Sequence, residues 1–202
     1  MNVYGLTGGP GCGKSTVSRY FREKHGWLIC DADAVCHELY SDPGSECIRT
    51  LASLFGKDIL APDGTVDRKV LTEKISCGDE KRHLLNRTVH PVIGREVERR
   101  IEAMKQKDAP GILLDAPLLY EAEWEQRTDA VIAVWSSPDV QMKRLLERGW
   151  SRQQAEYRIR AQISADEKLA RADYGIINDG PLDFLYRQCD KLIVSFNSLQ
   201  QR

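Results

Sequence analysis

Gly8-Gly9-Pro10-Gly11-Cys12-Gly13-Lys14-Ser15-Thr16 is the stretch of this chain that decides its fold. Its first, sixth, seventh and eighth residues match the spacing G-x-x-x-x-G-K-[ST]. An apolar run, residues 3–7, precedes the stretch, and a helical pattern, residues 14–25, follows it. Glycines allow successive backbone N–H groups to turn toward a polyphosphate, and the N-terminus of the helix adds partial positive charge. The stretch therefore predicts a phosphate-binding loop in its strand–loop–helix context.

Three side chains of this loop bear on its chemistry. Lys14 is expected to reach the β- and γ-phosphates of a nucleoside triphosphate, and the Ser15 hydroxyl is expected to ligate Mg²⁺. Cys12 lies close to the lysine, where a lowered thiol pKa would make it reactive. We favour a simpler interpretation, a small residue that fits the loop, because nothing else in the sequence indicates redox control.

The composition is that of a globular protein. The chain has 202 residues, 42% hydrophobic and 29% charged, enough for one core or a core with a small appended domain. Its net charge of -1 does not favour nucleic acid as the main partner. No apolar run is long enough for a bilayer, and the N-terminus lacks a signal-peptide pattern. We expect a cytoplasmic protein with neither nucleic acid nor membrane as partner; the sequence leaves its oligomeric state open.

The six cysteines form no C-x-x-C pair and no zinc-ligand spacing, so free thiols are expected. Apolar runs that read as strands alternate with helical patterns along the chain. The expected strands are residues 3–7, 27–30, 111–115, 130–135 and 174–177. This alternation predicts an α/β protein with a five-stranded parallel sheet, in the three-layer fold of P-loop NTPases.

A long segment between the second and third strands, residues 34–110, carries no strong strand signal. It is much longer than a crossover between parallel strands requires. Apolar side chains recur in it at spacings of three and four, on one face of a long helix. They are Leu85, Val89, Ile93, Val97, Ile101 and Met104. Pro91 is expected to kink or restart this helix. We expect a helical insertion at residues 34–110 and a nucleotide-binding core formed by residues 1–33 and 111–202.

Acidic residues follow two of the expected strands. Asp31 and Asp33 come directly after the second strand, at the edge of the sheet where ligands bind in open parallel sheets. Phosphoryl transfer to an alcohol needs a carboxylate that orients the hydroxyl and accepts its proton. We expect Asp33 in that role, with Asp31 as the competitor and helix capping as the alternative. Asp115 ends the third strand and is a second candidate, for Mg²⁺ through water, unless it is a helix cap or a salt-bridge partner.

Six basic residues against two acidic ones lie between residues 141 and 162. The basic residues are Lys143, Arg144, Arg148, Arg152, Arg158 and Arg160. Guanidinium groups neutralise charge on a transferred phosphoryl group and help to exclude water, so residues 144–163 are expected to form a lid. A solvated charged face is the alternative. With the loop and Asp33, the lid favours a small-molecule kinase.

Motifs along about nine-tenths of the chain resemble the dephospho-CoA kinase family. In chain order they are Gly5 to Gly9, Gly11 to Thr16, Asp31-Ala32-Asp33, Pro43-Gly44, Phe55-Gly56, Asp63-Gly64-Thr65-Val66-Asp67-Arg68, His90-Pro91, Pro117-Leu118-Leu119-Tyr120-Glu121, Arg144, Arg148, Arg158, Gln162, Ala172-Asp173 and Asn178. The loop is common to many ATPases, whereas Asp-Ala-Asp, His-Pro and Pro-Leu-Leu-aromatic-Glu in this order are specific. Pro10 and Cys12 depart from the aliphatic residue and serine usual in the family.

This resemblance implies ATP- and Mg²⁺-dependent phosphorylation of the ribose 3′-hydroxyl of dephospho-CoA, the last step of coenzyme A synthesis. It implies Asp33, Lys14 and Arg148 as catalytic residues and Ser15 as the metal ligand. The implied ATP-binding residues are Gly11, Cys12, Gly13, Lys14, Ser15, Thr16 and, on the adenine side, Asn178. The implied acceptor-binding residues are Asp33, His90, Leu118, Glu121, Arg144 and Gln162, with the insertion as the acceptor-binding domain.

Two alternatives remain open at this point. A nucleoside monophosphate kinase would need an arginine clamp for the acceptor phosphate within the insertion. The available arginines are Arg49, Arg68, Arg82 and Arg87. A nucleotide switch or binding protein would need a base-specificity motif such as N-K-x-D, which this sequence lacks, and it would have no use for an alcohol base at Asp33.

Overall fold

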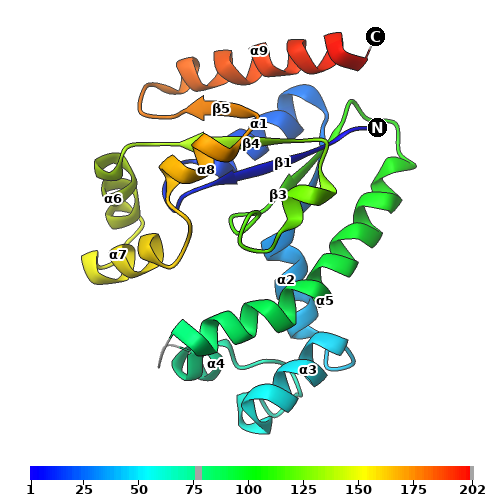
Figure 1. The fold of residues 1–202 in the computed structure, drawn as a ribbon, viewed down its shortest axis with the longest axis vertical. Helices are drawn as coiled ribbons and strands as arrows, with labels where there is room; N and C mark the ends of the chain where they lie inside the picture. Colours follow the sequence, from blue (N-terminus) through cyan, green and yellow to red (C-terminus); the bar gives the residue numbers. More distant parts are fainter. Residues whose placement is uncertain (76–78, 201–202) are drawn as a thin grey trace. The chain divides into compact units, whose positions relative to one another are not determined.

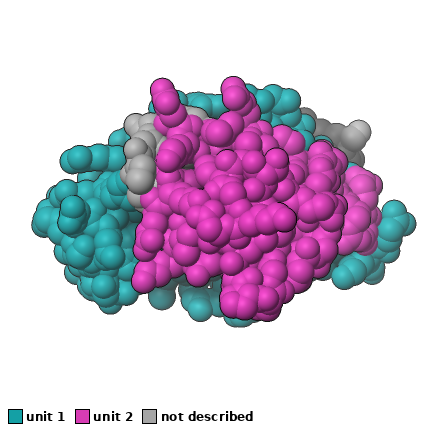
Figure 2. All heavy atoms as spheres, turned by 90° about the horizontal axis from the view of Figure 1, so that it is seen from below, with its two compact units in different colours: residues 1–30, 104–202 teal, residues 31–103 magenta. Residues whose placement is uncertain are grey.

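The computed structural model describes residues 1–75 and 79–200 (Figure 1). These residues divide into two compact units, residues 1–30 with 104–202 and residues 31–103 (Figure 2). The boundaries predicted from the sequence, after Asp33 and before Gly111, differ from these by a few residues; the roles assigned to the two units stay predictions. Throughout the described ranges, no helix has the length and apolar character needed to cross a membrane.

The larger unit is built on a five-stranded parallel sheet, as predicted. Its strands have the order β2-β3-β1-β4-β5 (Figure 1). They are β1 (Val3–Gly8), β2 (Leu28–Asp31), β3 (Ile112–Asp115), β4 (Ala130–Trp135) and β5 (Tyr174–Ile177). Every residue of β1 and β3 is buried, as expected for central parallel strands covered on both faces.

Helices cover the two faces of this sheet. Tyr174 of β5 contacts Phe196 of α9 (Leu182–Gln200), whereas a Cβ on the next residue, Gly175, would meet Leu169 of α8 (Ala165–Arg171). Because successive strand residues point to opposite faces, α9 and α8 lie on opposite sides of the sheet. Helix α1 (Lys14–His25) packs with α9, which completes a three-layer fold.

An aromatic cluster fills the layer between the sheet and α9. The Phe196 ring stacks on Tyr4 of β1 at a centroid distance of 4.1 Å and lies 5.9 Å from Trp27. Phe21 of α1 meets Trp27 edge to face at 5.1 Å. Four rings from four segments therefore share one core, so the final helix is held by packing with residues from the start of the chain.

The smaller unit is helical. It contains α2 (Ala32–Ser41), α3 (Glu46–Phe55), a 3₁₀ turn η1 (Lys57–Ile59), α4 (Arg68–Ile75) and most of α5 (Asp79–Lys105). Among its described residues after Asp31, which ends β2, no strand forms; there is an isolated bridge between Leu60 and Val66. The expectation of a segment without strands is met for these residues.

Pro91 does not restart the long helix. α5 continues through Pro91, and its ribbon changes direction partway along its length, in keeping with a proline kink (Figure 1). The predicted apolar face is buried at Leu85, Val89, Ile93, Val97 and Ile101. Burial of this face on both sides of the proline explains why one lost backbone hydrogen bond does not end the helix.

Other differences from the predicted elements are local. The helix α6 (Pro138–Glu147) follows β4, and α7 (Arg152–Arg160) begins with a capping box formed by Ser151 and Gln154. The helices α4 and α8 and the 3₁₀ turn η2 (Trp124–Arg127) were not predicted. The cysteines within the described residues are free thiols, as expected, and Cys77 lies outside these residues. The free thiols are Cys12, Cys30, Cys36, Cys47 and Cys189.

The aromatic cluster generates a stability prediction. Phe196→Ala removes a fully buried ring and should lower the free energy of unfolding by about 3–5 kcal/mol, measured by urea denaturation. The control is Val194→Ala in the same helix, whose side chain is 66% exposed; its effect should stay below about 0.5 kcal/mol. Equal effects of the two substitutions would show that α9 is not anchored by this cluster.

Candidate active site

The predicted phosphate-binding loop lies between the end of β1 and the start of α1. Gly11 and Gly13 have φ values of 80° and 91°, in the left-handed region that favours glycine. A Cβ on Gly13 would lie 2.1 Å from the Asn178 side-chain nitrogen, and one on Gly11 would lie 2.8 Å from the Gln141 carbonyl oxygen. Both glycines are therefore required by backbone conformation and by close neighbours.

Two predicted site residues donate hydrogen bonds to carbonyl groups of the loop. Asn178 is buried, and its Nδ2 donates to the Cys12 carbonyl at 2.7 Å. The Arg144 guanidinium donates to the Gly11 carbonyl at 3.2 Å, to Ser136 Oγ at 2.9 Å and to the Asn178 carbonyl at 2.8 Å. The structure thus brings Arg144 and Asn178 together as braces of the loop; their expected contacts with substrate stay predictions.

Lys14 forms an ion pair with Asp115 at the start of α1. Its Nζ donates to Asp115 Oδ1, and both side chains are largely buried. The pair is possible because β1 and β3 are neighbours, with Leu6 opposite Asp115 in their register. Of the three interpretations of Asp115, the structure therefore shows the salt-bridge partner.

The oxygen donors beside the loop suit Mg²⁺ by their chemistry. Ser15 supplies a hydroxyl in the first turn of α1, and Asp115 supplies a carboxylate. Within residues 1–75 and 79–200, no group of three His, Cys, Asp or Glu side chains forms an all-protein metal site. Mg²⁺ bound with phosphates needs only one or two protein ligands and keeps water, so this donor set fits the ion.

Cys12 does not have the lowered thiol pKa that its place close to Lys14 in the sequence allowed. Its side chain is fully buried, and this burial raises the pKa of the thiol above its ordinary value. The nearby cations Arg144 and Lys168 oppose the shift without reversing its direction. The loop cysteine is therefore a packed small residue, as favoured from the sequence.

The turn after β3 carries the predicted residues Leu118 and Glu121, and a buried lysine holds it. Lys168 of α8 is fully buried and donates to the Pro117 carbonyl; its Nζ also lies 3.2 Å from Glu121 Oε1 and 3.3 Å from Gln162 Oε1. Burial lowers the pKa of Lys168, and the Glu121 carboxylate opposes that shift. Glu121 Oε1 also accepts from the Ile163 N–H at 2.9 Å.

Lys168 thereby connects three segments that lie far apart in the sequence: the turn after β3, Gln162 and α8. Thr7 Oγ1 donates to the same Pro117 carbonyl at 3.2 Å, so the end of β1, which leads into the glycine loop, is also linked to this turn. Sequence reasoning missed Lys168 because one lysine in a charged region reads as a surface residue. A signal was present: Ser164 and Glu167 have the S-x-x-E spacing of a helix start, and Ser164 Oγ does accept from the Glu167 N–H.

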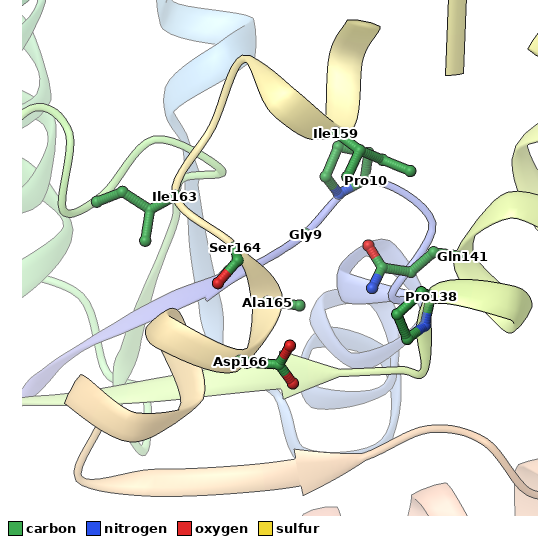
Figure 3. A pocket seen from close by; sticks show the side chains of 9 residues that line it. All are labelled: Gly9, Pro10, Pro138, Gln141, Ile159, Ile163, Ser164, Ala165 and Asp166. Carbon is green, nitrogen blue, oxygen red and sulfur yellow. The ribbon is translucent and has the colours of Figure 1, made fainter. Parts of the chain in front are cut away.

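The predicted lid, residues 144–163, is partly placed against the loop. Ile159 and Ile163 line a cavity of about 90 Å³ together with Gly9 and Pro10 of the loop (Figure 3). Arg148 ends α6, where its N–H bonds to the carbonyls of the last turn, and its side chain is exposed. In the described part of the chain no ion pair of Arg148 occurs.

The remaining predicted residues belong to the smaller unit. Asp31 is the N-cap of α2, with its Oδ1 accepting from the Ala34 N–H at 3.0 Å, and Asp33 lies in the first turn of that helix. Capping therefore falls to Asp31, and the capping alternative for Asp33 is wrong. His90 lies half-buried in α5, directly before the proline.

A glycine loop with Lys14 and Ser15, at the carboxyl end of the central strand of a parallel sheet, defines a P-loop nucleotide-binding protein. The family profile described as dephospho-CoA kinase matches residues 2–183. The chain is 41% identical to the dephospho-CoA kinase of Symbiobacterium thermophilum over 184 residues, which covers 91% of this chain and 76% of that protein. It is 38% identical to the dephospho-CoA kinase of Arabidopsis thaliana over 195 residues, covering 96% and 83%.

A crystal structure of a Thermus thermophilus protein superposes with a TM-score of 0.77 at 29% identity, covering 96% of this chain and 97% of that one. The chain belongs to the dephospho-CoA kinase family, the kinases of the final step of coenzyme A biosynthesis. Membership in a P-loop kinase family implies ATP as the nucleotide. The family match supports a dephospho-CoA kinase rather than the two alternatives left open by the sequence, a nucleotide switch and a nucleoside monophosphate kinase.

Burial of Cys12 predicts that its thiol reacts slowly with an alkylating reagent. In the folded protein at mildly alkaline pH, iodoacetamide should modify Cys12 far more slowly than half-buried Cys36, because burial raises the pKa of both thiols but only Cys12 is fully closed to the reagent. Peptide mass spectrometry measures both rates. Unfolding in urea should make the two rates similar; labelling of Cys12 at its unfolded rate in the folded protein would contradict the assignment.

The buried pair of Lys168 and Glu121 predicts strong coupling. Lys168→Met and Glu121→Gln should each lower the free energy of unfolding by about 3–5 kcal/mol, because each leaves a buried partner unpaired. The double variant should lose less than the sum of the two single losses. Exposed Lys143→Met is the control and should change little. Additive losses in urea denaturation would show that the two side chains act independently.

Proposed function

We propose that this chain transfers the γ-phosphoryl group of ATP to the ribose 3′-hydroxyl of dephospho-CoA, forming coenzyme A and ADP. The observation that carries the proposal is the braced glycine loop with Lys14, in a chain whose family match extends over residues 2–183. The N–H groups of the loop and the positive end of α1 suit a polyphosphate.

Nucleotide binding, as we propose it, begins with an exchange of partners. Lys14 is paired with Asp115 in the structure. A β- or γ-phosphate oxygen takes the place of Asp115 as the partner of the ammonium group, and Asp115 becomes an oxygen donor beside Ser15. When bound there, Mg²⁺ neutralises charge on the β- and γ-phosphate oxygens. Asn178, whose side chain donates to the Cys12 carbonyl, is proposed to bind on the adenine side of the nucleotide.

Asp33 is proposed as the general base. It accepts the proton of the ribose 3′-hydroxyl as that oxygen bonds to the γ-phosphorus, while the bond from the γ-phosphorus to the bridging oxygen breaks and ADP leaves. Its competitor, Asp31, already serves as the N-cap of α2. Asp33 is therefore the acidic residue of this turn that does not cap the helix.

The other predicted residues are proposed to act around the two substrates. Arg148, exposed at the end of α6, reaches the phosphates when the lid closes. Arg144 acts beside it while its guanidinium keeps the loop in place. Leu118, Glu121, Gln162 and His90 contact the acceptor, and Lys168 holds Glu121 and Gln162 in position for this.

The base assignment predicts a large loss of turnover. Asp33→Asn should lower kcat for dephospho-CoA by about 10²–10⁴-fold, because an amide cannot accept the proton, and should leave the KM for ATP nearly unchanged. Asp31→Asn is the matched control: asparagine caps a helix as well as aspartate does, so kcat should stay close to that of the unsubstituted protein. Coupled detection of ADP measures both.

Two outcomes would overturn the proposals separately. Near-normal kcat in the Asp33→Asn protein would show that another group is the base. Turnover of nucleoside monophosphates without turnover of dephospho-CoA would show that the acceptor is wrong, whatever the effect of Asp33→Asn.

A further inference from the structure

Two buried polar side chains to which the sequence assigned no role, those of Ser136 and Gln141, lie beside the glycine loop. Ser136 directly follows β4, and Gln141 is in the first turn of α6. Ser136 is fully buried, and Gln141 is 5% exposed. A buried polar side chain needs hydrogen-bond partners, so the partners of these two residues show what they hold in place.

The Ser136 hydroxyl connects three segments of the larger unit. Its Oγ donates to the Asn178 carbonyl at 2.9 Å, lies 3.4 Å from the Cys12 carbonyl oxygen and accepts from Arg144 Nη1 at 2.9 Å. The same Arg144 nitrogen donates to the Gly11 carbonyl at 3.2 Å. Because a hydroxyl both donates and accepts, Ser136 fixes the guanidinium group at the place from which it reaches the loop.

Gln141 supports the loop at two of its glycines. Its Nε2 donates to the Ser136 carbonyl at 2.8 Å, which fixes the amide group. A Cβ on Gly9 would lie 2.8 Å from Gln141 Oε1, and one on Gly11 would lie 2.8 Å from the Gln141 carbonyl oxygen. Gln141 also lines the cavity next to Gly9 and Pro10 (Figure 3). The loop therefore packs directly on the first turn of α6.

Both residues contact the carbonyl side of the loop. Within residues 1–75 and 79–200, neither side chain accepts a hydrogen bond from an N–H group of the loop. Ser136 and Gln141 therefore leave these N–H groups to the phosphates. A change at either residue reaches a bound nucleotide through the backbone of the loop.

We propose that Ser136 and Gln141 are positioning residues for the glycine loop. They hold the loop in the shape that binds the β- and γ-phosphates of the nucleotide, and they thereby raise the affinity for these phosphates. A loop that already has this shape loses less conformational entropy on binding than a loop that the ligand must order. The inference rests on the proposed use of ATP at this loop and does not depend on the acceptor.

Isothermal titration with Mg²⁺ and AMP-PNP, an ATP analogue whose γ-phosphoryl group is not transferred, tests the two residues. Ser136→Ala removes only the hydroxyl, and Gln141→Met keeps the length of the side chain without its amide. Each should raise the Kd for AMP-PNP about tenfold, the loss expected for one hydrogen bond. Inorganic tripolyphosphate, which has no nucleoside, should show the same loss. Unchanged binding of tripolyphosphate would place the effect on the nucleoside and overturn the assignment.

Steady-state kinetics separate positioning of the loop from a general loss of structure. In both variants the KM for ATP should rise about tenfold, whereas the KM for dephospho-CoA should change by less than about twofold. Loosening of the whole fold would raise both KM values. Ser136→Thr keeps the hydroxyl and should bind AMP-PNP with a Kd within about threefold of that of the unsubstituted protein.

Ser137→Ala is the matched control. Ser137 is the neighbouring residue and the N-cap of α6, and its side chain makes no capping hydrogen bond. This substitution should leave the Kd for AMP-PNP unchanged. Circular dichroism and urea denaturation show whether each variant is folded, and Gln141→Met tests the proposal by itself if the Ser136→Ala protein does not fold.

The titrations distinguish failure of this inference from failure of the proposed reaction. Unchanged binding of AMP-PNP and tripolyphosphate in the folded Ser136→Ala and Gln141→Met proteins would overturn the positioning role alone. Failure of the unsubstituted protein to bind AMP-PNP would overturn the use of ATP at the loop, and the positioning role with it. Failure to phosphorylate dephospho-CoA while AMP-PNP binds would overturn the acceptor alone, since the titrations need no acceptor.

Discussion

Hydrogen bonds to the carbonyl groups of the glycine loop are the constraint on which the rest of this structure depends. A loop that presents its N–H groups to phosphate turns its carbonyl groups the other way, and buried carbonyls need donors. Asn178 and Arg144 supply these donors to Cys12 and Gly11. Both donors follow strands that are neighbours in the sheet, β5 and β4, so the loop keeps its shape only while the order of the sheet is kept.

The same constraint explains which parts of the site were predictable from the sequence. The loop itself, its strand and its helix follow from local spacing, because glycine, lysine and serine at fixed offsets are enough to specify the motif. The partners of the loop are contributed by residues more than a hundred positions away, as with Arg144 and Asn178. Resemblance to a family indicated both residues, yet it indicated ligand contacts and not their bonds to the loop backbone.

Contacts between residues far apart in the sequence could not be predicted from the sequence. Asp115 ends its strand in a place that suits a metal ligand, and only the register of β1 with β3 shows that Lys14 reaches it. Asp31 and Asp33 lie two residues apart, and only the start of α2 shows which one is the cap. The strands, in contrast, were predicted nearly to the residue, since buried parallel strands are continuous apolar runs. At Pro91 the sequence left a kink and a restart open, and only the burial of the apolar face of α5 on both sides of the proline shows that the helix continues.

Lys168 and Lys14 in the larger unit differ in how firmly their ammonium groups are held. Lys168 is fully buried with three oxygen partners, so moving it would require transferring an ammonium group out of a satisfied network. Lys14 has one carboxylate partner and a side chain that is 17% exposed. Exchange of that partner for a phosphate oxygen keeps the ammonium group paired with an anion, whereas the buried Asp115 carboxylate then needs a new cation, a charge that Mg²⁺ bound with the phosphates would supply. The electrostatics therefore favour a fixed lysine in α8, where three oxygen atoms hold it, and an exchangeable one in α1, at the glycine loop.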